Sequence, residues 1–213
     1  MQWIDKLAED YASTYTSALD EHLQKIYDDT VANHTESHMI SSPLQGKLLE
    51  FISFLLRPKY ILEIGTFTGF SAICLAKGLQ SGGELHTIEL REEDANIAWK
   101  NILSARMDDK IHLHTGDARQ IIEALDYKWD LVFIDADKTS YITYYEAALQ
   151  RLSDQGFILA DNVLFHGQVL KEKIDGKSAK AIAQFNKHVL NDERTEQVFL
   201  TVRDGLLLIK KKS

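Results

Sequence analysis

The chain has 213 residues, of which 45% are apolar, and a formal net charge of −8 at pH 7. This length and apolar content suffice for one α/β domain with a sizeable core, while the acidic balance disfavours general binding to nucleic acid. The one cysteine, Cys74, excludes a disulfide within the chain and fits the reducing cytoplasm, and no apolar run approaches the roughly 20 residues that span a bilayer.

The first 58 residues are predicted to form helices that cap the rest of the domain. Apolar side chains recur at helical spacing from Ile4 to Tyr11 and again from Leu19 to Tyr27. The polar stretch over 33–38 is predicted to be a loop that leads into a third helix.

The third helix has a clear start and a clear end. Ser42 suits the N-cap, Pro43 suits the first helical position, and Gln45 stands where a capping box expects it. Pro58 ends the helix. Its predicted buried face consists of Leu48, Leu49, Ile52, Leu55 and Leu56.

From residue 59 to 213, predicted strands and helices alternate. Strands are expected over 60–64, 84–89, 111–114, 130–134 and 156–160, and helices near 70–78, 92–107, 117–125, 138–152 and 178–191. Strict alternation predicts a parallel, doubly wound, Rossmann-like α/β sheet. Two final strands, 196–202 and 205–211, are separated only by Asp204 or so and predict an antiparallel C-terminal hairpin. We therefore expect one domain over 1–213 with seven mostly parallel strands.

Acids and an amide follow the fourth and fifth predicted strands where each strand ends. Asp135 and Lys138 follow the fourth strand, and Asp161 and Asn162 follow the fifth. The carboxyl ends of neighbouring parallel strands lie about 5 Å apart, at the edge where α/β folds bind ligands. Each acid alone is more often a turn or helix-cap residue. Together, the oxygens of Asp135, Asp161 and Asn162 suit a hard divalent cation such as Mg²⁺, or alternatively Mn²⁺ or Ca²⁺.

The ends of the first three strands predict a nucleoside site without phosphate. The turn after the first strand contains Gly65, but the later glycines of the dinucleotide fingerprint are replaced by phenylalanine. Glu63, just before the turn, would repel a phosphate and attract an ammonium group. Glu89 is placed to accept both ribose hydroxyls, Asp117 to face an adenine amino group, and Ala118 to donate its amide to a ring nitrogen. These groups describe S-adenosylmethionine.

In these motifs the chain resembles the cation-dependent class I O-methyltransferases, the family that includes caffeoyl-CoA and catechol O-methyltransferases. The resemblance covers nearly the whole chain. It is carried by E-I-G-T-F-T-G-F-S at 63–71, H-T-I-E at 86–89, G-D-A at 116–118, F-I-D-A-D-K at 133–138, A-D-N-V-L-F-H-G at 160–167 and D-G-L-L-L-I at 204–209.

The resemblance implies roles for individual residues. Asp135, Asp161 and Asn162 match the cation ligands, and Lys138 matches the proposed catalytic base. Positions that line the cofactor are matched by Met39, Ser41, Glu63, Gly65, Ser71, Glu89, Ala118 and Asp137, and Asp135 is expected to border the cofactor as well. The resemblance also implies a homodimer.

The predicted reaction is methyl transfer from S-adenosylmethionine to one hydroxyl of a vicinal diol on a small phenolic molecule. Lys138 is expected to take the phenolic proton or to stabilise the phenolate. It can act as a base only if burial and a nearby cation lower its pKa, an effect that Asp137 would oppose. Met39 and Phe165 are expected to line the acceptor pocket, and the polar segment 165–177 to form its lid or wall.

Other acceptors and functions are weighed against this prediction. Plant relatives that act on CoA esters typically carry Trp at the position of Phe165, and the short loop here lacks their CoA-binding insertion, which favours a small catechol. A tRNA hydroxyuridine O-methyltransferase is the main alternative, with a basic patch from Lys171, Lys173, Lys177 and Lys180. A non-catalytic module that binds S-adenosylmethionine is a second alternative, but it would need no second acidic site.

Overall fold

The computed structural model describes residues 6–212, so Ile4 and the start of the first predicted helix lie outside it. The helices are α1 (Lys6–Thr14), α2 (Glu21–Asn33), α3 (Pro43–Leu56), α4 (Phe70–Ala76), α5 (Glu92–Ser104), α6 (Ala118–Ala124), α7 (Tyr141–Gln150) and α8 (Lys177–Leu190), and the short 3₁₀ turns are η1 (Ser37–Met39), η2 (Lys138–Ser140) and η3 (Gln168–Leu170). None of the helices in this part of the chain combines the length and apolar character needed to cross a membrane.

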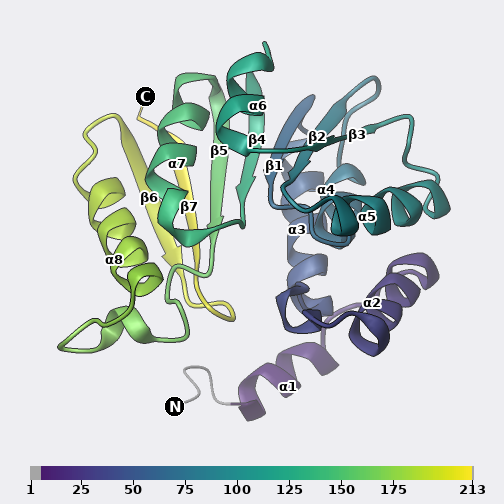
Figure 1. The fold of residues 1–213 in the computed structure, drawn as a ribbon, viewed down its shortest axis with the longest axis horizontal. Helices are drawn as coiled ribbons and strands as arrows, with labels where there is room; N and C mark the ends of the chain where they lie inside the picture. The colour runs from purple at the N-terminus through teal and green to yellow at the C-terminus, as the bar shows by residue number, and fades with distance from the viewer. Residues whose placement is uncertain (1–5, 213) are drawn as a thin grey trace.

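Seven strands form a single mixed sheet, as the sequence predicted (Figure 1). They are β1 (Tyr60–Ile64), β2 (Glu84–Glu89), β3 (Ile111–Thr115), β4 (Trp129–Ile134), β5 (Leu152–Asp161), β6 (Thr195–Leu200) and β7 (Leu206–Lys211), and their spatial order is β3-β2-β1-β4-β5-β7-β6. The strands β1 to β5 are parallel, whereas β7 runs antiparallel to both β5 and β6.

Several predicted boundaries differ from those of the structure. The strand β5 begins at Leu152 rather than 156, and the helix expected from 138 begins as the 3₁₀ turn η2 before α7. The C-terminal hairpin is joined by residues 201–205, because Leu200 pairs with Leu206. Its loop is therefore longer than the tight turn that the sequence suggested.

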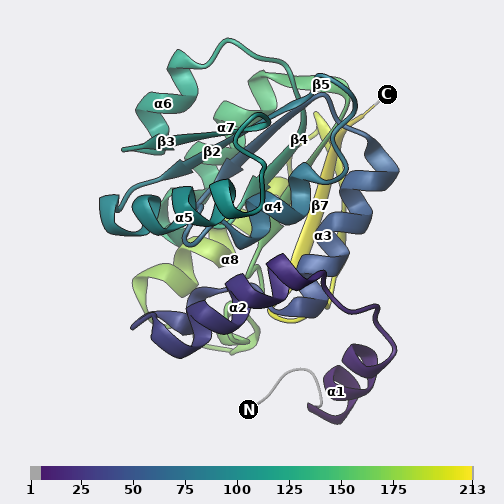
Figure 2. The same cartoon turned by 90° about the vertical axis from the view of Figure 1, so that its right-hand side faces the viewer.

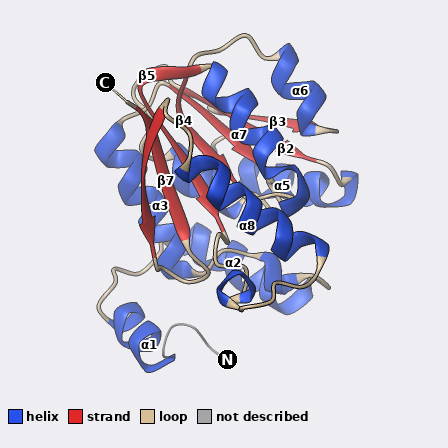
Figure 3. Cartoon of the chain, turned by 90° about the vertical axis from the view of Figure 1, so that its left-hand side faces the viewer, coloured by secondary structure: helices blue, strands red, loops and turns tan. Residues whose placement is uncertain are grey.

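The sheet separates two hydrophobic cores. One core packs α6, α7 and α8 against the sheet, and the other packs α2, α3, α4 and α5 against the opposite face. Figure 2 is viewed from the side of α3, α4 and α5, and Figure 3 from the side on which α8 lies in front. Burial of both faces explains why the central strands read as continuous apolar runs.

Helix α3 begins as predicted, but its capping box is incomplete. The Ser42 side chain accepts a hydrogen bond from the Gln45 amide at 3.3 Å, and Pro43 occupies the first helical position. The Gln45 side chain does not return to the N-cap; it extends to Asp161 instead.

Helix α3 buries most of the predicted face, and Leu55 is the exception. Gly46 lies against the ring of Phe70 on α4, where an added Cβ would be 2.6 Å from a ring carbon. Leu55, predicted to be buried, is 82% exposed, and Phe51 and Phe54 are exposed as well. Of the remaining predicted face, Leu49 is buried and Leu48, Ile52 and Leu56 are half-buried.

Candidate functional site

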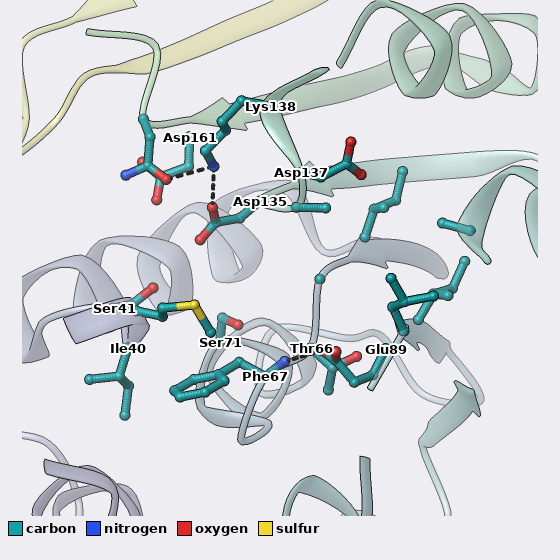
Figure 4. Close-up of a pocket in the computed structure, with 18 of the residues that line it drawn as sticks. Ile40, Ser41, Thr66, Phe67, Ser71, Glu89, Asp135, Asp137, Lys138 and Asp161 are labelled. Atoms are coloured by element: carbon teal, nitrogen blue, oxygen red, sulfur yellow. Dashed lines mark hydrogen bonds and ion pairs between the residues drawn. The ribbon is translucent and has the colours of Figure 1, made fainter. Parts of the chain in front are cut away.

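A cavity of about 1070 Å³ lies at the carboxyl ends of the parallel strands. Its walls come from the loops that follow β1 to β5, from residues 38–41, and from Arg203 and Asp204 before β7. Figure 4 shows residues from several of these elements facing one another. The strand order reverses direction between β1 and β4, so the cavity occupies the topological switch point where open α/β sheets bind ligands. Every predicted site residue lines this cavity except Glu63.

The predicted cation ligands converge in the structure. In the parallel register, Ile134 of β4 stands beside Ala160 of β5, so the residues that follow them, Asp135 and Asp161, emerge together. The ammonium of Lys138 donates to Asp135 Oδ1 at 2.9 Å and to Asn162 Oδ1 at 2.8 Å (Figure 4). One positive charge thus already bridges oxygens from both strand ends. The carboxylate and amide oxygens found here are the donors that Mg²⁺ prefers.

The pKa of Lys138 differs from the prediction. Burial is the largest single influence and would lower this pKa, but the charge of Asp135 and the contacts with Tyr141 and Asp135 together raise it above its usual value. The residue expected to oppose a fall was Asp137, yet Asp137 accepts hydrogen bonds from Tyr144 and Thr139 instead. Lys138 is therefore an ammonium in this structure and not a free base.

Asp161 is supported by two residues that the sequence did not reveal as part of the site. Gln45 Nε2 donates to Asp161 Oδ2 at 2.5 Å, and Gln45 Oε1 accepts a hydrogen bond from Arg203 at 2.7 Å. Burial and, secondly, the negative charge of Asp135 raise the pKa of Asp161 to about 7. A second cation near Asp161 would relieve this unfavourable ionisation. The capping position of Gln45 and the hairpin position of Arg203 gave no signal of these roles.

The turn after β1 requires glycine at its first position. Gly65 has φ +99°, and an added Cβ would lie 2.0 Å from the carbonyl oxygen of Asp135. The Gly65 amide also donates to the carbonyl of Ile88 at 3.0 Å. The first strand end is thus held tightly between β2 and β4, and the backbone is exposed to the cavity.

Glu63 is completely buried and does not line the cavity, from which Ser71 separates it. Strand alternation turns it toward α4, where Ser71 lines the cavity beside it. Thr87 donates to Glu63 Oε2 at 2.5 Å, whereas Oε1 has no hydrogen-bond partner within residues 6–212. Burial raises the pKa of Glu63 to about 8 against the smaller opposing effects of the Ser71 and Thr87 hydroxyls. A buried carboxyl with an unused oxygen is a favourable neighbour for a cationic ligand.

Glu89 is the last residue of β2, and its side chain binds the loop after β1 and the loop after β2. Its carboxylate accepts a hydrogen bond from the Phe67 amide at 2.7 Å (Figure 4) and another from the Arg91 amide at 3.0 Å. Phe67 has φ +49°, a conformation that non-glycine residues rarely adopt. The carboxylate therefore shapes the glycine turn, in addition to the ribose contact predicted for it.

At the end of β3, Asp117 caps helix α6 and pairs with Arg119. Its Oδ1 accepts a hydrogen bond from the Arg119 amide at 2.9 Å, and both oxygens face the Arg119 guanidinium. These contacts lower the pKa of Asp117. The carboxylate lines the cavity, as does Ala118 at the first helical position, so the predicted contacts with adenine stay compatible with this arrangement.

The opposite mouth of the cavity is formed by two loops. Met39 in η1 is 40% exposed, whereas Ser41 is buried at the start of α3. Phe165 and His166, both with positive φ, complete this side. Residues 167–177 do not line the cavity, so the predicted wall is confined to the beginning of the polar segment 165–177.

Comparison with known proteins relates this site to one enzyme family. The O-methyltransferase family model matches residues 12–212. The catechol O-methyltransferase of Niastella koreensis is 39% identical over 150 residues, which cover 68% of this chain and 67% of the relative. An SAH-bound O-methyltransferase from Bacillus cereus has a TM-score of 0.88 at 32% identity, with 97% of both chains covered. An SAH-bound methyltransferase from Podospora anserina has a TM-score of 0.92 at 25% identity and covers 100% of this chain and 98% of its own.

Proposed function

Because the chain belongs to the O-methyltransferase family, as its motifs predicted, we propose that it transfers the methyl group of S-adenosylmethionine to one hydroxyl of a vicinal diol, with the help of a divalent cation. The observation that carries this proposal is the convergence of Asp135, Asn162 and Lys138 on one wall of the cavity, with Asp161 emerging beside Asp135. The opposite wall contains the glycine turn and Glu89. One cavity thus offers a separate subsite to each of two reactants.

S-adenosylmethionine is the proposed methyl donor. The two similar solved structures contain SAH, its demethylated product, which supports this assignment. Gly65 and Ala118 would present backbone to the donor, Glu89 would accept its ribose hydroxyls, and Glu63 would attract its ammonium through Ser71. The remaining donor contacts are proposed for Met39, Ser41, Asp117, Asp135 and Asp137.

A divalent cation fits the side chains at the ends of β4 and β5. Asp135, Asp161 and Asn162 would hold it, and Mg²⁺ is the preferred ion because all three supply oxygen. When bound, such a cation lowers the pKa of a diol hydroxyl and fixes the orientation of the diol. The raised pKa of Asp161 supports this proposal, since a buried carboxyl that resists ionisation gains most from a cation.

Lys138 is proposed to stabilise the phenolate by its positive charge. A neutral phenol is a poor nucleophile for in-line displacement at a sulfonium methyl, so developing negative charge on the oxygen must be compensated. The Lys138 ammonium is 15% exposed and already contacts oxygens of both strand ends. Its raised pKa favours this electrostatic role over that of a general base.

The acceptor is proposed to be a small catechol. Met39 and Phe165 would contact its ring, and the relative from Niastella koreensis, named for catechol, supports the substrate class. No specific observation favours tRNA as the acceptor, because exposed acids such as Glu172 and Asp175 alternate with the lysines of the candidate basic patch. Lys180 is within 3.9 Å of Asp175.

A homodimer formed through α1 and α3 is also proposed. Leu7 and Tyr11 on α1 are 75% and 66% exposed, and Phe51, Phe54 and Leu55 on α3 are at least half exposed. Exposed apolar side chains gathered on two helices are typical of a protein interface, so a second copy of this chain is the proposed cover. The buried free thiol of Cys74 supports a cytoplasmic location for this assembly.

Turnover with a panel of catechols, flavonoids and bulk tRNA, each with and without EDTA, tests this function. We expect methylation of catechols that depends on added Mg²⁺. Methylation of tRNA alone would refute the proposed acceptor class, and full activity in EDTA would refute the proposed cation.

A further inference from the structure

A group of histidines lies at the amino ends of β2 and β3, remote from the cavity. We define the histidine cluster as Glu84, His86, His112 and His114. Glu84 and Glu89 are the first and last residues of β2, so Glu84 is about 16 Å from the strand end that borders the cavity, at 3.3 Å per residue. His114 lies nearer that end, since it is paired with Ile88. His86 is paired with His112 in the parallel register, and strand alternation places the whole cluster on the side of the sheet covered by α6 and α7.

Three of these side chains point toward a common centre. His86 Nε2 is 3.4 Å from Glu84 Oε2, and His112 Nε2 is 3.8 Å from the same oxygen. One ligand atom from each residue lies within 4.8 Å of the others. Around a tetrahedral Zn²⁺ with bonds of about 2.0–2.1 Å, ligand atoms are about 3.4 Å apart. Only small side-chain shifts separate the observed positions from that geometry.

From this geometry we infer that Glu84, His86 and His112 form a second cation site, selective for a divalent metal that prefers imidazole, such as Zn²⁺. Imidazole nitrogen suits Zn²⁺, Ni²⁺ and Cu²⁺, whereas Mg²⁺ prefers oxygen. The site therefore differs in both place and metal preference from the oxygen ligands proposed in the cavity.

The position of His86 agrees with a ligand role. Its side chain is only 6% exposed, and within residues 6–212 its Nε2 lies 3.4 Å from Glu84 Oε2 without completing a hydrogen bond. The other ring nitrogen, Nδ1, lies 3.0 Å from His114 Nε2. A histidine that binds a metal typically donates its second nitrogen to such an orienting partner. In the tautomer with hydrogen on Nδ1, the Nε2 lone pair is directed at the centre of the cluster and is available to a metal.

The surroundings of the cluster complete the proposed site. The Tyr127 hydroxyl donates to Glu84 Oε2 at 3.3 Å, and the Tyr127 ring packs 4.4 Å from that of His86. The Glu84 and His112 side chains are 36% and 44% exposed, which leaves a path for the ion and a position for water as the fourth ligand.

A second group in the chain is a natural control. Glu146, His188 and Asp192 also lie within metal-binding distance of one another. There, however, His188 Nε2 lies 2.7 Å from Glu146, and the Arg194 guanidinium contacts both carboxylates. An internal cation already pairs with both carboxylates of this group, as a metal would.

For the test, the enzyme is first freed of bound metal and then placed in excess Mg²⁺. Zn²⁺ binding is measured by calorimetric titration, and visible absorption is recorded for Co²⁺ at the same site. We expect one Zn²⁺ per chain that Mg²⁺ does not displace, and tetrahedral Co²⁺ absorption. His112→Gln should weaken Zn²⁺ at least tenfold and abolish the Co²⁺ bands, while His114→Gln should weaken it about tenfold through loss of orientation. His188→Gln should bind Zn²⁺ as the wild type does.

Because His112 is exposed, its substitution preserves folding, which circular dichroism verifies, and Mg²⁺-supported methyl transfer should be unchanged. The inference is overturned if His112→Gln binds Zn²⁺ as tightly as the wild type, or if Mg²⁺ competes fully for the bound Zn²⁺. Neither result would bear on the methyltransferase activity itself.

Discussion

Glu63→Gln should stabilise the cofactor-free protein while weakening its binding of S-adenosylmethionine. The buried carboxyl has a pKa of about 8 in the folded protein against 4.5 as a model value. Between these two values the folded state keeps a proton that the unfolded chain releases. Stability therefore falls as pH rises from about 4.5 to about 8, since the folded state binds more protons there.

The size of this effect follows from the pKa difference. One pKa unit corresponds to about 1.36 kcal/mol. Near pH 7.5, about three units above the model value, the buried carboxyl therefore lowers the free energy of unfolding by about 4 kcal/mol. Glutamine keeps the shape of the side chain and cannot ionise, so the free energy of unfolding of the variant should exceed that of the wild type by up to this amount. The pKa of Asp161 is also raised, and this residue is present in both proteins. The stability of the variant should therefore still fall somewhat as pH rises.

Urea unfolding followed by circular dichroism at several pH values from 5 to 8 measures this directly. The free energies of unfolding of wild type and Glu63→Gln should diverge steadily as pH rises, in favour of the variant. Glu172→Gln, at an exposed loop position, is the matched control and should follow the wild type. Parallel curves for wild type and Glu63→Gln would refute the reasoning about the buried charge.

Three further predictions concern the proposed site and assembly. Glu89→Ala should lose two charge-assisted hydrogen bonds to the ribose, each worth about 1.5–3 kcal/mol, and loosen the Phe67 turn; unchanged affinity for S-adenosylmethionine in calorimetry would remove Glu89 from the site. Lys138→Ala should slow single-turnover methylation about 10²-fold or more, with partial recovery at high pH as phenolate forms, while Lys180→Ala stays normal; an unaffected Lys138→Ala would leave the proposed cation as sole activator. Leu55→Glu should convert a dimer to monomers in light scattering, and an unchanged mass would exclude α3 from the interface.

The sequence predicted the sheet well because its local and long-range signals agree. The central strands are apolar on both faces, the helices between them have regular spacing, and Gly65 marks the first turn. Parallel strands meet at one edge, so residues that immediately follow β4 and β5 could be brought together without coordinates. This logic located Asp135, Asp161 and Asn162.

The errors arose where side-chain direction or partner choice decides the outcome. Gln45 matched a capping box, but its amide satisfies the buried Asp161, a contact across 116 positions that local pattern does not encode. Leu55 matched an apolar helix face and is nevertheless 82% exposed, whereas Leu49 on the same face is buried. Asp137 was expected to oppose a fall in the pKa of Lys138, but the carboxylate that the Lys138 ammonium contacts is that of Asp135, at 2.9 Å.

The central claim is that methylation needs a divalent cation and both hydroxyls of a vicinal diol. Single-turnover methyl transfer from S-adenosylmethionine, measured for caffeic and coumaric acids with EDTA-treated enzyme before and after addition of Mg²⁺, tests it most directly. We predict rapid methylation of caffeic acid only after Mg²⁺ is added, and very slow methylation of coumaric acid throughout. Equal rates for the two acids, or full activity before Mg²⁺ is added, would contradict the account.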